Sequence, residues 1–180
     1  MRNTVWIAAV LALGACAPAG QGTTQEEVRP RMFSVPLLDA QGRGMGTLMA
    51  LQRGTNVEVR VTSTGLPAGT HGVHFHETGL CEGPAFTTAG GHLNPTGRQH
   101  GLSNPNGPHL GDLPNLVVGA DGRGTLEATI AGSLTPGQAP LFDANGTAFI
   151  VHAAADDQRT DPSGNSGARI ACAVVAAPVQ

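Results

Sequence analysis

The chain has 180 residues, a length that suits one domain with a sizeable core. Its formal net charge is -3, and all ten of its basic residues are Arg, a balance too mild to indicate binding to nucleic acid. With 26 Gly and 13 Pro but no Tyr, the composition disfavours long helices and favours short elements joined by turns. We therefore expect an all-β fold.

The first residues have the pattern of a secretory signal. Arg2 precedes an apolar run over residues 5–13, which is too short for a transmembrane helix of about 20 residues. The run ends in Leu13-Gly14-Ala15-Cys16, which resembles the bacterial lipobox, whose cysteine is lipidated and becomes the new N-terminus. We expect a lipoprotein signal peptide at 1–15 and lipidation of Cys16. Cleavage at an ordinary small-residue site just downstream is the alternative.

A flexible tether is expected at 16–30, where small and polar residues show no apolar period, followed by a single domain at 31–180. Short alternating or β-branched runs then appear at the spacing of a sandwich or barrel, separated by turn signals. The expected strands are 32–38, 45–52, 56–64, 72–77, 115–118, 124–131, 147–152 and 169–176.

Two long segments interrupt this pattern. Residues 78–114 are rich in Gly, Pro and Asn and hold three histidines together with Cys81 and Asp112. Residues 153–167 form the second segment. Structureless segments of this length are rarely mere connections, so we expect both to be functional loops.

All seven histidines lie between His71 and His152. His74 and His76 are two residues apart, so in a strand they project from one face, roughly 6.6 Å apart, and could share an ion. His71 precedes His74 by three residues and should point to the opposite face. Imidazole ligands suit copper or zinc rather than magnesium or calcium. With His92, His100, His109 and Asp112 added, the donors exceed what one four-coordinate ion can use, so two metal sites fit the sequence.

Three cysteines are an odd number for an exported protein. Lipidation of Cys16 would leave Cys81 and Cys172 as a pair that can close a disulfide. Participation of Cys81 in a metal site as a thiolate is the alternative, and the spacing leaves it open.

Four segments resemble motifs of the copper,zinc superoxide dismutase family, in the family's order, and the resemblance spans about Phe33 to Val175. They are HGVHFH at 71–76, HLNP at 92–95, HLGDL at 109–113 and GNSGARIAC at 164–172. The resemblance implies an eight-stranded antiparallel Greek-key β-barrel or sandwich, immunoglobulin-like, with two long functional loops.

The same resemblance implies the site. Copper would be bound by His74, His76, His92 and His152, and zinc by His92, His100, His109 and Asp112, so that His92 bridges the two metals. His71 and Asp156 would support the ligands, and Arg169 would sit over the copper and attract the anionic substrate. Cys172 would pair with Cys81 and anchor the first long loop to the last strand.

The implied activity is dismutation of superoxide to dioxygen and hydrogen peroxide, with one copper and one zinc per subunit and with Arg169 and His92 as catalytic residues. The alternatives are a copper- or zinc-binding protein of the same fold without turnover, and an adhesion module that would leave the ligand set unexplained. We expect attachment to a membrane through Cys16, facing the periplasm or cell exterior, and no nucleic-acid partner. The sequence leaves open a monomer or a homodimer.

Overall fold

The structure, a computed structural model, describes residues 31–135, 141 and 143–176. The expected signal peptide, Cys16 and tether lie outside these residues. Over the described ranges the chain forms strands and one 3-10 turn at Thr87–Ala89, and none of their helical segments is long and apolar enough to span a membrane.

The strands are β1 (Met32–Leu38), β2 (Gly44–Arg53), β3 (Asn56–Ser63), β4 (Gly69–His71), β5 (Val73–His76), β6 (Leu116–Val118), β7 (Gly124–Ala131), β8 (Thr147–His152) and β9 (Arg169–Ala176). One sheet has the order β5-β8-β9-β1-β2-β3-β7, and a smaller sheet pairs β4 with β6. Every pairing is antiparallel. The predicted all-β antiparallel class is confirmed. β4 was not expected, because three residues are too few to show an alternating pattern.

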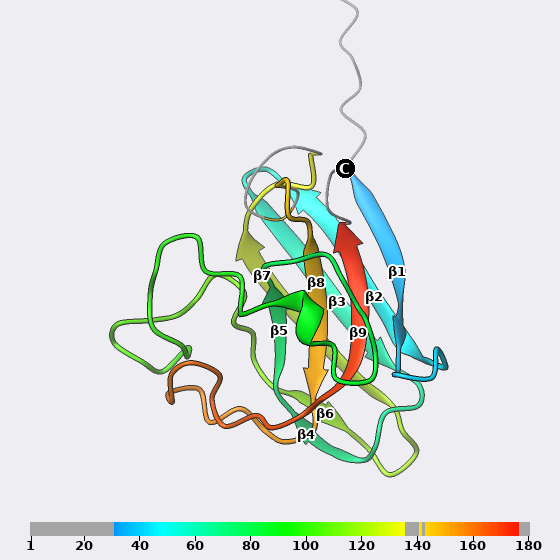
Figure 1. Ribbon diagram of the computed structural model, residues 1–180. Coiled ribbons are helices and arrows are strands. Elements are labelled where there is room, and N and C mark those ends of the chain that lie inside the picture. Colours follow the sequence, from blue (N-terminus) through cyan, green and yellow to red (C-terminus); the bar gives the residue numbers. More distant parts are fainter. Residues whose placement is uncertain (1–30, 136–140, 142, 177–180) are drawn as a thin grey trace, which may run out of the picture.

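The larger sheet curls, so that β5, β8 and β9 face β2, β3 and β7 across one core (Figure 1). The residue pattern of β3 explains which face of the sheet lies against the core. Val57, Val59 and Val61 are buried, while Glu58 and Arg60 between them are exposed. Side chains two apart in a strand share a face, so this alternation sets which side of the sheet turns inward.

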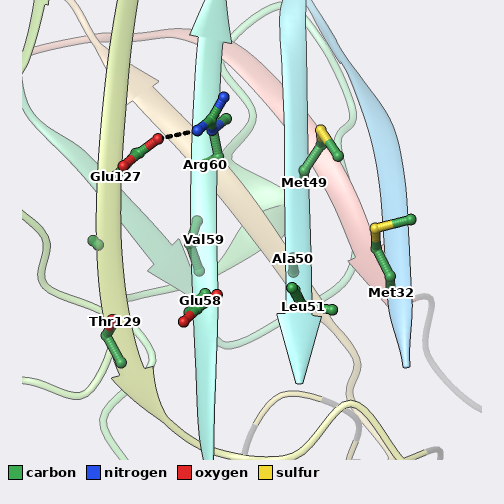
Figure 2. Close-up of a pocket in the computed structure, with 10 residues that line it drawn as sticks. Met32, Met49, Ala50, Leu51, Glu58, Val59, Arg60, Glu127 and Thr129 are labelled. Atoms are coloured by element: carbon green, nitrogen blue, oxygen red, sulfur yellow. Dashed lines mark ion pairs between the residues drawn. The ribbon is translucent and has the colours of Figure 1, made fainter. Parts of the chain in front are cut away.

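The outer face of β1, β2, β3 and β7 is open to solvent. Figure 2 shows the side chains of Met32 and Met49 on neighbouring strands and the ion pair between Arg60 and Glu127. These residues help to line a shallow hollow of about 490 Å³, and the lining set, drawn from the described residues, contains no histidine. The candidate metal ligands therefore lie elsewhere.

β8 differs from the other strands because all six of its residues are buried. Phe149 and Val151 enter the main core. Ala148 and Ile150 point the other way, into a second small cluster with Phe86 of the first long loop. Burial on both faces explains the continuous apolar run of this strand, and it carries His152, its last residue, into the protein interior.

A disulfide joins Cys81 of the first long loop to Cys172 of β9. The predicted pairing is confirmed, and a thiolate at Cys81 is excluded as a metal ligand because its sulfur is in this bond. The bond holds the part of the loop around Phe86 and Ala89 against the outer side of β8 and β9, where both residues pack in one cluster with Cys172.

Candidate metal centre

Backbone pairing brings loop residues beside β5. The Phe75 amide donates to the Gly111 carbonyl at 2.9 Å, and the Leu93 amide donates to the Phe75 carbonyl at 2.8 Å. Isolated bridges consequently place Asp112 opposite His74 and His92 opposite His76. Two segments of the first long loop thus lie along the edge of β5 that is not paired with β8, and the candidate metal ligands meet at this edge.

Four histidines converge in a first metal-binding group: His74, His76, His92 and His152. One potential ligand nitrogen from each lies within 4.8 Å of the other three. Within the described part of the chain these four nitrogens, Nδ1 of His74 and Nε2 of the others, are buried without a hydrogen-bond partner. An unsatisfied buried polar group costs about 1–3 kcal/mol, so four that converge at one point indicate a site built to bind a cation. An all-imidazole set of this kind fits copper.

Backbone carbonyls hold the opposite nitrogen of two of these rings. Nδ1 of His76 donates to the Gly90 carbonyl at 3.0 Å, and Nδ1 of His152 donates to the Gly167 carbonyl at 3.0 Å. Because a carbonyl only accepts, the proton is fixed on Nδ1, and the lone pair of Nε2 points to the shared position.

The second group surrounds Asp112. Nδ1 atoms of His92, His100 and His109 lie 2.9, 3.0 and 3.3 Å from its Oδ1. Tetrahedral zinc with ligands about 2.0 Å away would place the donor atoms about 3.3 Å from one another. The four donors therefore fit zinc. By mutual proximity alone, His74 rather than His109 groups with His92, His100 and Asp112. The Nε2 of His74 is held by a different carboxylate, however, and its free Nδ1 belongs to the first group, whereas Nδ1 of His109 lies beside Asp112.

Asp156 is that carboxylate, and it links the two groups. Its Oδ2 lies 2.6 Å from Nε2 of His74, and its Oδ1 lies 3.0 Å from Nε2 of His100. Asn115 holds its backbone by donating to the Asp156 carbonyl and accepting from the Asp156 amide, at 2.9 and 2.8 Å. A Cβ at Gly164 would collide with Oδ1 of Asp156, so the close approach of the second loop requires glycine there.

Burial keeps the copper-side imidazoles neutral. It lowers the pKa of His74 to about 3, although the hydrogen bond to Asp156 acts in the opposite direction. It lowers the pKa of His76 to about 2 and of His152 to about 4, and it also lowers the pKa of His92. Neutral imidazole is the form that binds a metal ion.

The protonation of the side chains around Asp112, on the zinc side, differs from that of the copper-side imidazoles. Burial opposes protonation of His100, but hydrogen bonds to Asp112 and Asp156 outweigh it and raise its pKa to about 9. Burial also disfavours both carboxylates, yet hydrogen bonds with the histidines hold the pKa of Asp112 and of Asp156 well below the usual range. The pair of buried carboxylates thus favours positive charge at the position that zinc would take.

Arg169 lies at the start of β9, paired with His152 in the β8–β9 register. Its Nη1 donates to the Phe86 carbonyl and its Nη2 to the Gly90 carbonyl, each at 2.7 Å. It lies close to the copper-side group, because Nδ1 of His76 bonds the same Gly90 carbonyl. Its charge contributes to the lowered pKa of His76 and His152. Burial lowers the pKa of the guanidinium itself, which stays cationic at neutral pH.

His71 lies outside both groups. Its Nδ1 is 2.7 Å from the His152 carbonyl, and its Nε2 is 2.9 Å from the Pro67 carbonyl. The ring thus braces the end of β8 through the backbone. Nothing in the sequence indicated the backbone acceptors at Pro67, Gly90 and Gly167, because every residue has a carbonyl group. Nothing indicated the role of Asn115 either, because that residue was assigned to an expected strand.

Comparison with known proteins identifies the family. The family model for copper/zinc superoxide dismutase (SODC) matches residues 44–175. Cu-Zn superoxide dismutase 2 of Aquifex aeolicus is 38% identical over 144 residues, which cover 77% of this chain and 83% of that protein. Cu-Zn superoxide dismutase of Deinococcus radiodurans is 36% identical over 193 aligned positions, with 97% of each chain covered.

Solved structures of similar proteins support the same family. A SOD-like protein from Bacillus subtilis is similar with a TM-score of 0.72 and 40% identity, over 78% of this chain and 97% of that one. The Cu/Zn superoxide dismutase from Brucella abortus gives a TM-score of 0.62 and 26% identity, over 81% and 99%. The chain therefore belongs to the copper/zinc superoxide dismutase family, whose members use copper and zinc to dismute superoxide.

Proposed function

We propose that this protein dismutes superoxide in the cell envelope through a domain at 31–180 that binds one copper and one zinc. The proposed copper ligands are His74, His76, His92 and His152, and the proposed zinc ligands are His92, His100, His109 and Asp112. The observation that carries the proposal is the convergence of four buried, unpartnered imidazole nitrogens. When bound, copper supplies one-electron redox chemistry, which zinc cannot, and zinc supplies a fixed positive charge.

Arg169 is proposed to bind the substrate anion. Superoxide carries one negative charge, and the guanidinium is held in place by two backbone carbonyls, which leave its positive charge unneutralised. A fixed cation beside the copper group attracts and orients an anion without the entropy cost of ordering a free side chain.

His92 is proposed to carry a proton. Two superoxide ions and two protons yield one dioxygen and one hydrogen peroxide, so one superoxide loses an electron while the other gains an electron and two protons. Nδ1 of His92 is held beside Asp112, whereas its Nε2 is buried and faces the copper-side group. Because the same lone pair is proposed to bind copper, this nitrogen would hold a proton only when it is not bound to the metal, and it could then release that proton to the reduced product.

The Arg169→Ala variant tests the proposed role of Arg169 in binding the substrate anion, together with the enzymatic activity itself. The wild-type protein loaded with copper and zinc is expected to remove superoxide at a rate that falls as salt is added. The variant is expected to lose about tenfold in kcat/KM and much of that salt dependence, because steering by charge contributes about 10- to 1000-fold to association. Stopped-flow decay of superoxide at several ionic strengths measures both quantities.

Arg60→Ala is the matched control, because it removes the same charge from the outer face of β3. Absence of activity in the fully metallated wild-type protein would contradict the enzymatic function and favour a non-enzymatic metal-binding protein. Equal activity and salt dependence in Arg169→Ala and wild type would contradict only the role of Arg169.

We also propose export and lipid anchoring. The disulfide is compatible with an exported protein, because such bonds persist in oxidising compartments. The pattern Leu-Gly-Ala-Cys supports lipidation at Cys16 and removal of residues 1–15.

Mass spectrometry of the membrane-associated protein tests the anchor. The mature chain is expected to begin at Cys16 and to carry acyl chains, and Cys16→Ser is expected to release it from the membrane. Trp6 lies in the removed segment and is the one tryptophan of the chain, so the mature protein should show almost no absorbance at 280 nm. An unmodified N-terminus beyond residue 16 would instead indicate ordinary cleavage.

A further inference from the structure

The proposed zinc histidines each turn their Nε2 atom away from the zinc position, toward a different neighbour. Nε2 of His92 is the buried atom that faces the copper-side group. Nε2 of His100 lies 3.0 Å from Oδ1 of Asp156. Nε2 of His109 lies 3.7 Å from Oδ1 of Asp161. Of these three contacts, the one with Asp161 has no part in the proposed function.

Asp161 makes a second contact with the same ligand set. Its Oδ1 also accepts the backbone N–H of His100 at 2.6 Å. One carboxylate oxygen of the β8–β9 loop therefore lies against two proposed zinc ligands, the backbone of His100 and the ring of His109. The side chain is about half exposed, at 49%, so solvent screens its charge only in part.

We propose that Asp161 is a positioning residue whose carboxylate orients His100 and His109 and strengthens zinc binding. A carboxylate beside the outer N–H of a ligating imidazole fixes the ring orientation and makes the metal-facing nitrogen more basic. Asp161 would act on His109 through its charge, across 3.7 Å, whereas Asp156 lies within hydrogen-bonding distance of His100, at 3.0 Å. The inference rests on the proposed zinc ligands and goes beyond them, because Asp161 itself binds no metal.

The contribution of the charge can be separated from the anchoring of the loop. Other hydrogen bonds join the same two loops and do not involve Asp161. Among them are those from the Ser103 amide to the Gln158 carbonyl at 3.0 Å, from the Asn104 side chain to the Arg159 carbonyl at 3.3 Å, and from the Gln158 side chain to the Leu113 carbonyl at 3.2 Å. Asp161→Asn keeps an oxygen acceptor for the His100 amide but removes the charge. Asp161→Leu removes both.

The test is the zinc dissociation constant of the folded, copper-loaded protein, measured by competition with a chromophoric chelator. Asp161→Asn is expected to bind zinc about tenfold more weakly than wild type, at the low end of the effect of outer carboxylates because the side chain is half exposed. Asp161→Leu is expected to bind it more weakly still. Copper content should be unchanged in both, since Asp161 contacts no copper-side histidine in the described residues.

Asp121→Asn is the control, because it removes the same charge from the turn between β6 and β7, where Asp121 accepts the Arg123 amide. A zinc affinity of Asp161→Asn within twofold of wild type would overturn the inference, whatever Asp161→Leu shows. A wild-type protein that binds no zinc at these histidines would refute the proposed ligand set, and the inference with it. The two failures are therefore distinguishable.

Discussion

The His152→Ala variant, loaded with copper and zinc, is expected to lose superoxide dismutation by more than about 100-fold, since even changes to outer groups around a metal cost 10- to 100-fold. The substitution removes one of four converging nitrogens from a buried position at the end of β8 and puts no ligand in its place. Zinc content should stay near that of wild type, because the donors around Asp112 come from the first long loop. Elemental analysis beside an activity assay measures both effects.

Val151→Ala is a suitable control for this experiment. It shortens the neighbouring residue of the same strand, which faces the main core, and lowers stability without touching a proposed ligand. It should retain copper and most activity per folded molecule. A His152→Ala protein that holds copper and turns over as fast as Val151→Ala would show that the fourth nitrogen is dispensable.

Cys172→Ser is expected to lower the free energy of unfolding by about 4 kcal/mol, because the bond to Cys81 closes a loop with a sequence separation of 91. For a protein of this size that corresponds to a fall in Tm of roughly 8–16 °C. The specific activity should fall as well, since Phe86 and Gly90, whose carbonyls hold Arg169, lie in the released loop. Calorimetry of the metal-loaded protein and kcat/KM at low temperature measure the two effects.

Cys81→Ser provides an internal check on this result. Both single variants and the double variant remove the same bond, so their Tm values should agree, and a reducing agent should bring the wild-type protein close to them. A double variant far less stable than either single one, or a wild-type Tm insensitive to reduction, would refute the explanation.

Much of the fold could be predicted because its strands obey simple alternation or burial patterns. The alternating valines of β3 and the apolar run of β8 identified strands whose ends match the structure to within a residue. β4 was missed, since Gly69, Thr70 and His71 carry no periodic signal and pair with β6 only through the closure of the fold.

The candidate site was predictable to the extent that its chemistry resides in side chains. Histidines two apart in HGVHFH and the clustering of the remaining donors indicated metal binding, and the resemblance to a family divided them between two ions. The supporting contacts were not predictable, because the carbonyls of Phe86, Gly90 and Gly167 have no residue-type signature. The assignment of each ligand to copper or zinc stays a prediction until metal content is measured.

The carbonyl oxygen of Gly90 accepts hydrogen bonds from both Nη2 of Arg169 and Nδ1 of His76. Both lone pairs of one atom are thus engaged, one by the proposed substrate-binding cation and the other by a proposed copper ligand. Because this acceptor belongs to the main chain, alanine scanning of side chains cannot delete it. Mutations that displace the loop backbone at Gly90 should therefore alter the attraction of the substrate and the geometry of the copper ligands together. The sequence of this loop is thus constrained by both requirements.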